Sequence, residues 1–275
     1  IRGKYRSRRM ENIVKEARWL AENGVTELVV VAQDTTRYGE DIYGKSMLPE
    51  LLTALCEIDG FKWIRTLYCY PERITDELLD VIAKEDKLVK YLDMPIQHCN
   101  KTILKRMNRH GDRETLTALI KKIREKIPNV TLRTTLITGF PGETEEQFEE
   151  LCEFVKEIRF ERLGCFAYSP EEGTPAEKFE DQVPLKDRER RAEIIMEEQM
   201  IISDSLNEAA LDSEVEVVCE GFDRYAECYY GRSQADAPEI DGKIFFLSED
   251  KVRVGEYVKV KIDDTMDYDL IGSKM

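Results

Sequence analysis

The sequence predicts an α/β protein: a partial (β/α)6 barrel followed by a small antiparallel β-barrel. The first observation is that short β-rich apolar runs alternate with helical stripes through the first two thirds of the chain. The runs begin near residues 27, 63, 91, 131 and 162. They are separated by the length of a βα unit, which predicts parallel strands with right-handed crossovers. The second observation is a period-two alternation of apolar residues after Leu211.

Helices are predicted wherever apolar residues recur at helical spacing. The stripes run over residues 10–21, 48–58, 78–82, 116–127 and 148–158. The strands between and after them are predicted at residues 27–32, 63–68, 91–94, 132–137 and 162–167. Because the chain opens on a helix, six βα units need one more strand in front of it. On periodicity alone, a doubly wound open sheet remains an alternative to the barrel.

The last third of the chain changes character twice. Ser169 to Leu185 is rich in Pro, Gly, Glu and Asp and is predicted to be a loop, and Lys186 to Ala210 is predicted to be a long charged helix. Residues 215–219 then begin the period-two pattern, and glycines separate further short runs, which is typical of a small antiparallel barrel. We therefore predict two domains, residues 1–211 and residues 212–275.

Composition excludes several classes of protein. The net charge of −15 argues against a strongly nucleic-acid-binding surface, since phosphate contacts need clustered Lys and Arg. No apolar run is long enough to cross a bilayer and no signal segment is evident, so no membrane contact is expected. The seven cysteines form no Cys-x-x-Cys pair, which favours reduced, core-packed thiols in the cytoplasm. With only two histidines and no ligand spacing, the corner Gln97-His98-Cys99 is not predicted to bind a metal.

A polar or glycine-rich turn follows each predicted parallel strand. Since the carboxyl ends of the strands in repeated βα folds open onto one face, we expect these turns to form one shared site. These turns are Gln33-Asp34-Thr35-Thr36, Tyr70-Pro71-Glu72 and the stretches at residues 94–98, 139–144 and 168–175. For each turn taken alone, loop solvation or an ordinary strand end stays open as the structural alternative.

The sharpest turn is the stretch Gly139-Phe140-Pro141-Gly142-Glu143-Thr144. Its two glycines let the backbone approach a ligand closely. Thr144 can cap the following helix, whose N-terminus attracts anionic groups. The stretch is not a Walker loop, because the Gly-Lys-Ser/Thr element is absent. A tight strand-to-helix turn is the alternative interpretation.

Taken together and in order, the motifs resemble the radical S-adenosylmethionine methylthiotransferases, with a TRAM domain at the end of the chain. In the first part the matching stretches are residues 2–8, 33–35, 95–98, 104–109, 139–144 and 168–176. In the last part they are Gly231-Arg232-Ser233, residues 237–242 and residues 268–272. The resemblance covers essentially all 275 residues.

The resemblance implies that S-adenosylmethionine is bound by ten residues of these turns: Gln33, Asp34, Thr35, Gln97, Gly139, Phe140, Pro141, Gly142, Glu143 and Tyr168. It also implies two [4Fe–4S] clusters. The family holds the catalytic cluster with a Cys-x-x-x-Cys-x-x-Cys loop just before the stretch matched at residues 2–8, so the cluster cysteines are expected to precede Ile1. That loop is not in this sequence. We therefore expect a piece of a longer enzyme, with no catalytic residue of its own and no cluster ligand among the seven cysteines present.

The resemblance is strongest to the branch that adds a methylthio group to the β-carbon of an aspartate in the twelfth protein of the small ribosomal subunit. Residues 33–39 and 236–242 carry it. A transfer-RNA adenosine methylthiotransferase and a non-catalytic binding fragment stay open as alternatives. Residues 212–275 contain 16 acidic and 8 basic side chains, a balance of −8. Such a surface favours a basic ribosomal protein over nucleic acid as the partner.

Overall fold

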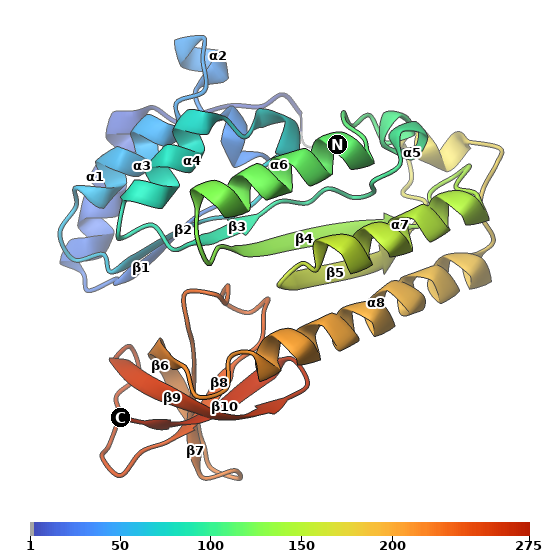
Figure 1. Ribbon diagram of the computed structural model, residues 1–275. Helices are drawn as coiled ribbons and strands as arrows, with labels where there is room; N and C mark the ends of the chain where they lie inside the picture. The colour runs from blue at the N-terminus through green and yellow to red at the C-terminus, as the bar shows by residue number, and fades with distance from the viewer. Residues whose placement is uncertain (1–2) are drawn as a thin grey trace. The chain divides into compact units, whose positions relative to one another are not determined.

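The computed structural model describes residues 3–275. Ile1, which the cluster cysteines are expected to precede, and Arg2 of the first matching stretch therefore lie outside the described residues. The chain divides into two compact units (Figure 1). The first contains the chain up to Met94 together with Lys121–Val130, and the second contains Pro95–Ile120 together with Thr131–Met275. Among the described residues, no helix is both long enough and apolar enough to span a bilayer.

The first unit is built from βα segments. Its helices are α1 (Met10–Glu22), α2 (Glu40–Tyr43), α3 (Leu48–Cys56) and α4 (Asp76–Lys84), with the 3-10 turns η1 (Thr35–Arg37) and η2 (Pro71–Arg73). Its strands are β1 (Glu27–Val30), β2 (Trp63–Thr66) and β3 (Tyr91–Asp93). β1 and β2 pair in parallel, and Leu88, just before β3, forms a parallel bridge with Ile64 of β2. The helices α3 and α4 bury leucines that close the core of this unit.

The second unit begins with a parallel strand pair backed by helices. Its helices are α5 (Lys101–Arg106), α7 (Glu145–Ile158) and α8 (Leu185–Glu208), with the 3-10 turn η3 (Ala176–Lys178). Helix α6 (Arg113–Lys126) begins in this unit and ends in the first. β4 (Thr131–Thr138) and β5 (Arg162–Ala167) pair in parallel, from Arg133 opposite Arg162 to Thr138 opposite Ala167. α8 packs against β5 and against α7 (Figure 1).

The stretch Gly139–Thr144 ends at the first residue of a helix cap, because α7 begins directly after it. Thr144 is the N-cap of α7: its hydroxyl accepts the N–H of Gln147 at 3.3 Å. The Gln147 side chain in turn accepts the N–H of Thr144 at 3.0 Å. This capping box satisfies two N–H groups that the first helical turn leaves without partners. The predicted capping role of Thr144 is confirmed.

Five strands close the C-terminal barrel. They are β6 (Glu214–Asp223), β7 (Cys228–Arg232), β8 (Ile244–Leu247), β9 (Tyr257–Met266) and β10 (Asp269–Lys274), in the order β10-β8-β7-β6-β9. The inward residues of the predicted period-two pattern, among them Val217, Val260 and Ile262, form its core. Four of the pairings are antiparallel and β8–β10 is parallel. An odd number of strands cannot alternate all the way around a closed ring, so one parallel pair is unavoidable in this otherwise antiparallel barrel.

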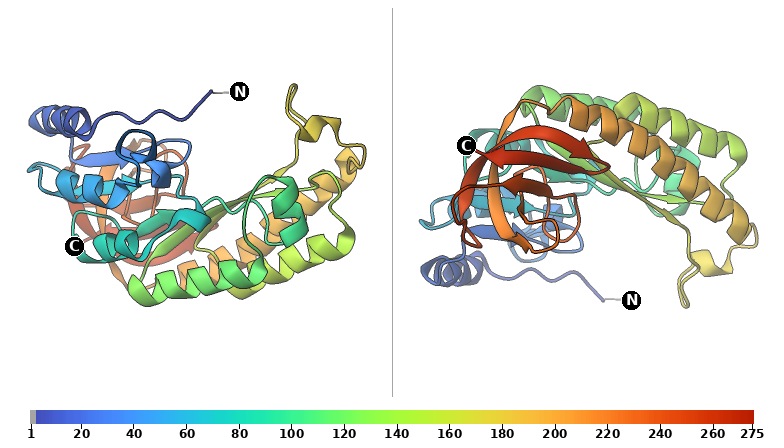
Figure 2. Two further views of the ribbon diagram at one scale, coloured as in Figure 1. Left: turned by 90° about the horizontal axis from the view of Figure 1, so that it is seen from above. Right: turned by 90° about the horizontal axis from the view of Figure 1, so that it is seen from below.

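Two ion pairs attach a barrel loop to the amino ends of β4 and β5. Arg162 Nη2 lies 2.7 Å from Asp236 Oδ1, and Arg133 Nε lies 3.5 Å from Asp241 Oδ1. Both carboxylates are almost fully buried, and the Asp236 carboxylate also accepts the N–H and hydroxyl of Ser233. Helix α8 provides the covalent connection between sheet and barrel (Figure 2, right). The conspicuous stretch at residues 236–242 therefore fixes the barrel to the sheet.

The predicted fold class is confirmed. The five strands expected in the first two thirds of the chain begin at residues 27, 63, 91, 131 and 162, as predicted, and the pairings β1–β2 and β4–β5 are parallel. The long helix predicted at 186–210 is α8, and the segment before it contains only the short turn η3. The prediction of a small closed barrel is confirmed as well.

We predict that Arg162→Met lowers the free energy of unfolding by on the order of 3 kcal/mol, because it leaves the buried Asp236 carboxylate without its charged partner. Urea denaturation measures the change. Lys259→Met is the matched control, since Lys259 belongs to an exposed pair with Glu214 at 3.9 Å and its loss should have little effect. Equal stabilities for the two variants would contradict the assigned role of the Arg162–Asp236 pair.

Candidate functional site

The turn after β1 is organised by the carboxylate of Asp34. Its Oδ1 accepts hydrogen bonds from the backbone N–H of Thr36, at 3.1 Å, and from the Thr36 hydroxyl. Asp34 is thereby the N-cap of η1. Its Oδ2 lies 3.6 Å from Arg73 Nε and has no hydrogen-bond partner among the described residues. Burial raises the pKa of Asp34, against the opposing effects of Thr36 and Arg73. Gln33, the preceding residue, is exposed.

Thr35 connects the turn after β1 to the end of β2. Its N–H donates to the carbonyl of Tyr68 at 3.1 Å, and its hydroxyl donates to the carbonyl of Leu67 at 2.9 Å. Tyr68 has a φ of 60°, and its N–H donates to the Asp93 carboxylate at the end of β3 at 2.9 Å. The first unit thus brings together the carboxyl ends of β1, β2 and β3, as the βα pattern predicts.

Gln97 lies at a strained turn beside β4. Its N–H donates to the carbonyl of Thr135 at 2.9 Å and its carbonyl accepts the N–H of Ile137 at 2.8 Å, so its backbone is held at the edge of the strand. Its φ of 69° is in the left-handed region, which few non-glycine residues adopt. The side-chain Oε1 is buried and has no hydrogen-bond partner among the described residues. Strain together with an unsatisfied acceptor is characteristic of a ligand-binding position.

The loop Gly139–Glu143 is folded around its own carboxylate. Both oxygens of Glu143 lie 3.0 Å from the N–H of Gly139, so the carboxylate closes the loop from inside. Arg191 of α8 donates to Glu143 Oε1 at 2.8 Å and to the Glu143 carbonyl at 3.1 Å. His98 Nε2 lies 3.4 Å from Glu143 Oε2, and neither side chain is exposed. Glu143 was predicted to line the site, and its carboxylate lies behind the loop, where it fixes the position of the loop backbone.

Both glycines of this loop are required by packing within the protein. Gly139 has a φ of +69°, and a Cβ there would lie 2.1 Å from Cγ of Arg188. Gly142 has a φ of +82°, and a Cβ there would lie 2.5 Å from Oδ2 of Asp181 and 2.9 Å from Cζ of Arg106. The sequence suggested that these glycines allow a ligand to come close. The structure gives an internal reason instead: α8 and the segment before it occupy the space.

Tyr168 and Phe140 form an aromatic pair at the ends of β4 and β5. Their ring centroids are 5.1 Å apart in an edge-to-face arrangement, and Pro141 beside them is buried. The N–H of Tyr168 donates to the carbonyl of Thr138 at 2.8 Å, and Arg188 donates to the Tyr168 carbonyl at 2.7 Å. The Tyr168 hydroxyl has no hydrogen-bond partner among the described residues, and burial raises its pKa. It is therefore a protonated hydroxyl available to a ligand.

The predicted site residues consequently fall into two groups. Gln33, Asp34 and Thr35 belong to the first unit, and the other seven belong to the second. In the second unit, Gln97 is bound to one edge of β4 and Tyr168 to its carboxyl end, so both are positioned by the same strand. Each group contributes at least one buried oxygen without a hydrogen-bond partner among the described residues.

Sequence reasoning missed four residues that position the site: Asp93, His98, Arg188 and Arg191. His98 lies in the matching stretch at residues 95–98 and in the Gln97-His98-Cys99 corner, and neither pattern predicts a positioning role for it. Arg188 and Arg191 belong to a long charged helix, where no spacing distinguishes them from solvated neighbours. Asp93 follows a short apolar run, and its place at a predicted strand end was the signal that could have identified it.

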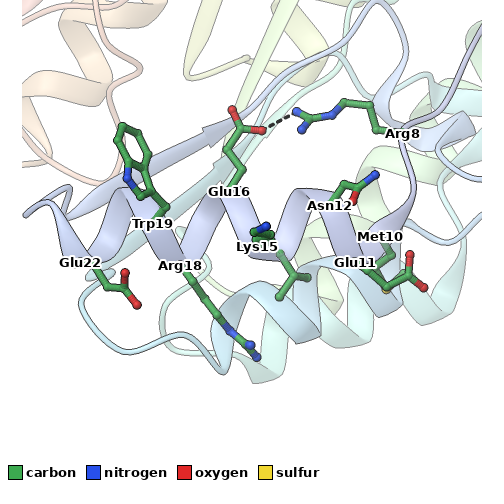
Figure 3. A pocket seen from close by; sticks show the side chains of 10 residues that line it. Arg8, Met10, Glu11, Asn12, Lys15, Glu16, Arg18, Trp19 and Glu22 are labelled. Carbon is green, nitrogen blue, oxygen red and sulfur yellow. Dashed lines mark ion pairs between the residues drawn. The ribbon is translucent and has the colours of Figure 1, made fainter.

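Two surface hollows are found in the first unit. The larger, about 910 Å³, runs along α1, where Glu16 and Arg8 form an ion pair and Trp19 projects from the helix (Figure 3). It contains none of the predicted site residues. A second hollow, of about 400 Å³, is lined by β1 and by the segment Tyr5–Arg8, and it includes one predicted site residue, Thr35.

The cysteines of the described residues are buried or half-buried free thiols. Burial raises the pKa of Cys69 and of Cys165 to about 12 and that of Cys56 to about 11, as expected for thiols packed in a core. In residues 3–275, no group of three or more His, Cys, Asp or Glu side chains is placed to hold a metal ion. The residues that the structure describes therefore do not fit an iron–sulfur cluster.

Comparison with known proteins identifies the parts of the chain. Residues 1–155 match the radical SAM superfamily and residues 213–274 match the TRAM domain. The ribosomal protein uS12 methylthiotransferase RimO of Clostridium botulinum (strain Okra) is 50% identical over 272 residues, which cover 99% of this chain and 61% of that protein. The protein of the same name from Lachnoclostridium phytofermentans is 52% identical over 273 residues, 99% of this chain and 62% of that protein. This chain thus spans about three fifths of the length of these relatives.

A solved structure supports the same fold. Coproporphyrinogen III oxidase (HemN) from Escherichia coli, described as a radical SAM enzyme, superposes with a TM-score of 0.53 at 21% identity. The superposition covers 71% of this chain and 46% of that protein, and at this identity it shows the fold alone. The parallel βα segments, the ordered turns at the strand ends and a superfamily match over more than half of the residues lead to one conclusion: this chain belongs to the radical SAM superfamily.

Proposed function

We propose that this chain is the S-adenosylmethionine-binding and TRAM part of a methylthiotransferase of the RimO type. Its reaction would replace one hydrogen on the β-carbon of an aspartate in ribosomal protein uS12 by a methylthio group. The observation that carries the proposal is the 50–52% identity to proteins of that name over 99% of the chain. The same relatives favour a protein substrate over a transfer-RNA adenosine, and an enzyme over a non-catalytic fragment. Modification of a ribosomal protein would take place in the cytoplasm.

S-adenosylmethionine fits the groups that the strand ends leave without partners. Gln97 Oε1, Asp34 Oδ2 and the Tyr168 hydroxyl are buried polar atoms without hydrogen-bond partners among the described residues. The ligand offers an amino group and ribose hydroxyls as partners for them. Gln33, Thr35 and the loop Gly139–Glu143 complete the proposed binding set, with Glu143 acting through the loop backbone that it holds.

When bound, S-adenosylmethionine and a [4Fe–4S] cluster would supply the radical chemistry. The described residues do not provide the cluster ligands, and we place both proposed clusters on parts of the enzyme that this sequence does not contain. The role of this chain is then to bind and orient the ligand and to exclude water from it. We also propose the domain limits 1–211 and 212–275, on the change of sequence pattern at Leu211.

The proposed function is tested with the reconstituted enzyme that contains this chain. Small ribosomal subunits and transfer RNA are incubated separately with the enzyme, S-adenosylmethionine, a reductant and a sulfide source. Mass spectrometry of the uS12 peptides should show a methylthio group on one aspartate and no change in the transfer RNA. Methylthiolation of the transfer RNA without that of uS12 would overturn the proposal.

We predict that Tyr168→Phe weakens S-adenosylmethionine binding about 2- to 12-fold, the loss of one neutral hydrogen bond. The free energy of unfolding should stay the same or rise slightly, because a buried hydroxyl without a protein partner is removed. Isothermal titration calorimetry and urea denaturation measure the two effects. The control is Tyr229→Phe, whose hydroxyl accepts the N–H of Val252 in the barrel and which should bind the ligand normally. Unchanged binding by Tyr168→Phe would remove Tyr168 from the proposed site.

The acidic barrel is proposed to bind the basic ribosomal protein. Several acidic residues of residues 212–275 are already engaged in ion pairs, as Asp236 and Asp241 are with arginines of the sheet. Asp263 and Asp264 near the end of β9 are exposed and belong to no ion pair among the described residues, so their charge is available to a partner. Complementary charge of this kind steers association more than it sets affinity.

We predict that the double variant Asp263→Lys/Asp264→Lys slows association with uS12, and that the difference from wild type shrinks at high salt, since exposed charges are screened. Surface plasmon resonance at low and physiological salt measures the association rate. Glu193→Lys/Glu197→Lys makes the same change of net charge on the exposed face of α8 and is the matched control. The barrel loses its proposed role if the two double variants associate equally fast.

A further inference from the structure

We propose that His98 is a positioning residue for S-adenosylmethionine: it holds the Gln97 turn and the Gly139–Glu143 loop in one fixed arrangement. The inference rests on the proposed function, because the ligand whose binding it affects is the one proposed above. It assigns to a buried histidine a role that neither metal binding nor core packing explains. The residues involved all belong to the second unit.

His98 follows directly after the strained residue of the site. Gln97 has a φ of 69°, and its backbone is pinned to Thr135 and Ile137 of β4. His98 then turns into the protein interior, where its side chain is fully buried. Any movement of the imidazole is therefore transmitted to Gln97, whose unpartnered Oε1 faces no acceptor or donor of the described protein.

The hydrogen bonding of His98 fixes its tautomer. Nδ1 accepts the backbone N–H of Asn100 at 2.9 Å, so the proton of a neutral imidazole must be on Nε2. Nε2 lies 3.4 Å from Glu143 Oε2 and has no hydrogen-bond partner among the described residues. The Nε2 proton of His98 thus lies close to the carboxylate that closes the Gly139–Glu143 loop, in a polar contact that falls short of hydrogen-bond geometry.

The buried Glu143 carboxylate is stabilised by the nearby Nε2 N–H of His98. It is buried, and a buried carboxylate is stable only when its oxygens are served by donors and its charge is balanced. Arg191 serves Oε1 at 2.8 Å and balances the charge, and the N–H of Gly139 is shared by both oxygens. Nε2 of His98 lies 3.4 Å from Oε2, a polar contact outside hydrogen-bond geometry. Without it, Glu143 can rotate toward Arg191 and release the Gly139 end of the loop.

Two conservative substitutions test the contributions of the two ring nitrogens of His98 separately. In His98→Gln the side-chain amide can replace Nε2 as the N–H group beside Glu143 but leaves the N–H of Asn100 without its acceptor. In His98→Asn the side-chain oxygen can replace Nδ1 as that acceptor but leaves Glu143 without the N–H group. A residue with a purely structural role should lose stability and binding together in both variants.

We predict that His98→Asn raises the Kd and the KM for S-adenosylmethionine at least about fivefold, because Glu143 Oε2 loses the N–H group that lies closest to it besides Gly139 and the loop is held less firmly. The KM for uS12 should be unchanged. His98→Gln should bind S-adenosylmethionine within about twofold of wild type, because the N–H group beside Glu143 is kept. Thermal unfolding is measured for both variants. The control is His110→Asn, which changes the only other histidine of the chain, an exposed one, and should match wild type.

Equal ligand affinity of His98→Asn and His98→Gln, whether normal or reduced in step with Tm, would overturn the inference. Nitrogen-15 NMR of the histidine rings provides a second readout on this chain without any cofactor, and a proton on Nδ1 of His98 would also overturn it. Failure of the proposed function can be told apart from failure of the role proposed for His98. An enzyme that binds S-adenosylmethionine and shows the contrast between the two variants, yet leaves uS12 unmodified, would refute only the substrate assignment.

Discussion

The burial of one carboxylate organises the second unit. Glu143 lies inside the protein, where an ion without partners would be severely destabilising, and each of its contacts therefore fixes the element that provides it. Through Gly139 the carboxylate contacts the end of β4, through Arg191 it contacts α8, and through His98 it contacts the turn after Pro95. The backbone of the Gly139–Glu143 loop is consequently determined from the inside, before any ligand is considered. A rigid loop of this kind is what a site needs if it is to bind a ligand without first being ordered by it.

The glycines of the same loop have a packing role that the sequence pattern did not indicate. Close backbone approach does occur at Gly139 and Gly142, but the atoms that approach belong to Arg188, Asp181 and Arg106. The loop is enclosed by the protein on the side where these glycines lack a side chain. Groups free to meet a ligand are instead found on Gln97 and Tyr168, whose backbones are tied to β4 while their polar atoms have no partner among the described residues.

The C-terminal barrel depends on a different use of buried charge. Asp236 and Asp241 reach arginines at the amino ends of β5 and β4, so the barrel is attached at the end of the strands opposite to the proposed site. Part of the acidity that the composition shows is used in this internal attachment. The negative charge that stays exposed, on Asp263 and Asp264 among others, is the charge that is accessible to a partner. Net charge alone did not separate these two uses.

The sequence by itself determined the elements and their order. The starts of the five parallel strands, the helix at α8, the cap at Thr144 and the closed barrel all follow from local periodicity and turn chemistry, which depend on neighbours in the chain. The ten proposed site residues lie in turns after strands and were selected among the turn residues by the resemblance to the methylthiotransferase family. Only the tertiary structure decided which of their atoms are available. The His98 and Arg191 partners of Glu143 are separated from it by 45 and 48 residues, and the arginine partners of Asp236 and Asp241 by 74 and 108 residues. No local pattern encodes such pairings, because the desolvation that makes them necessary arises only when distant elements pack together.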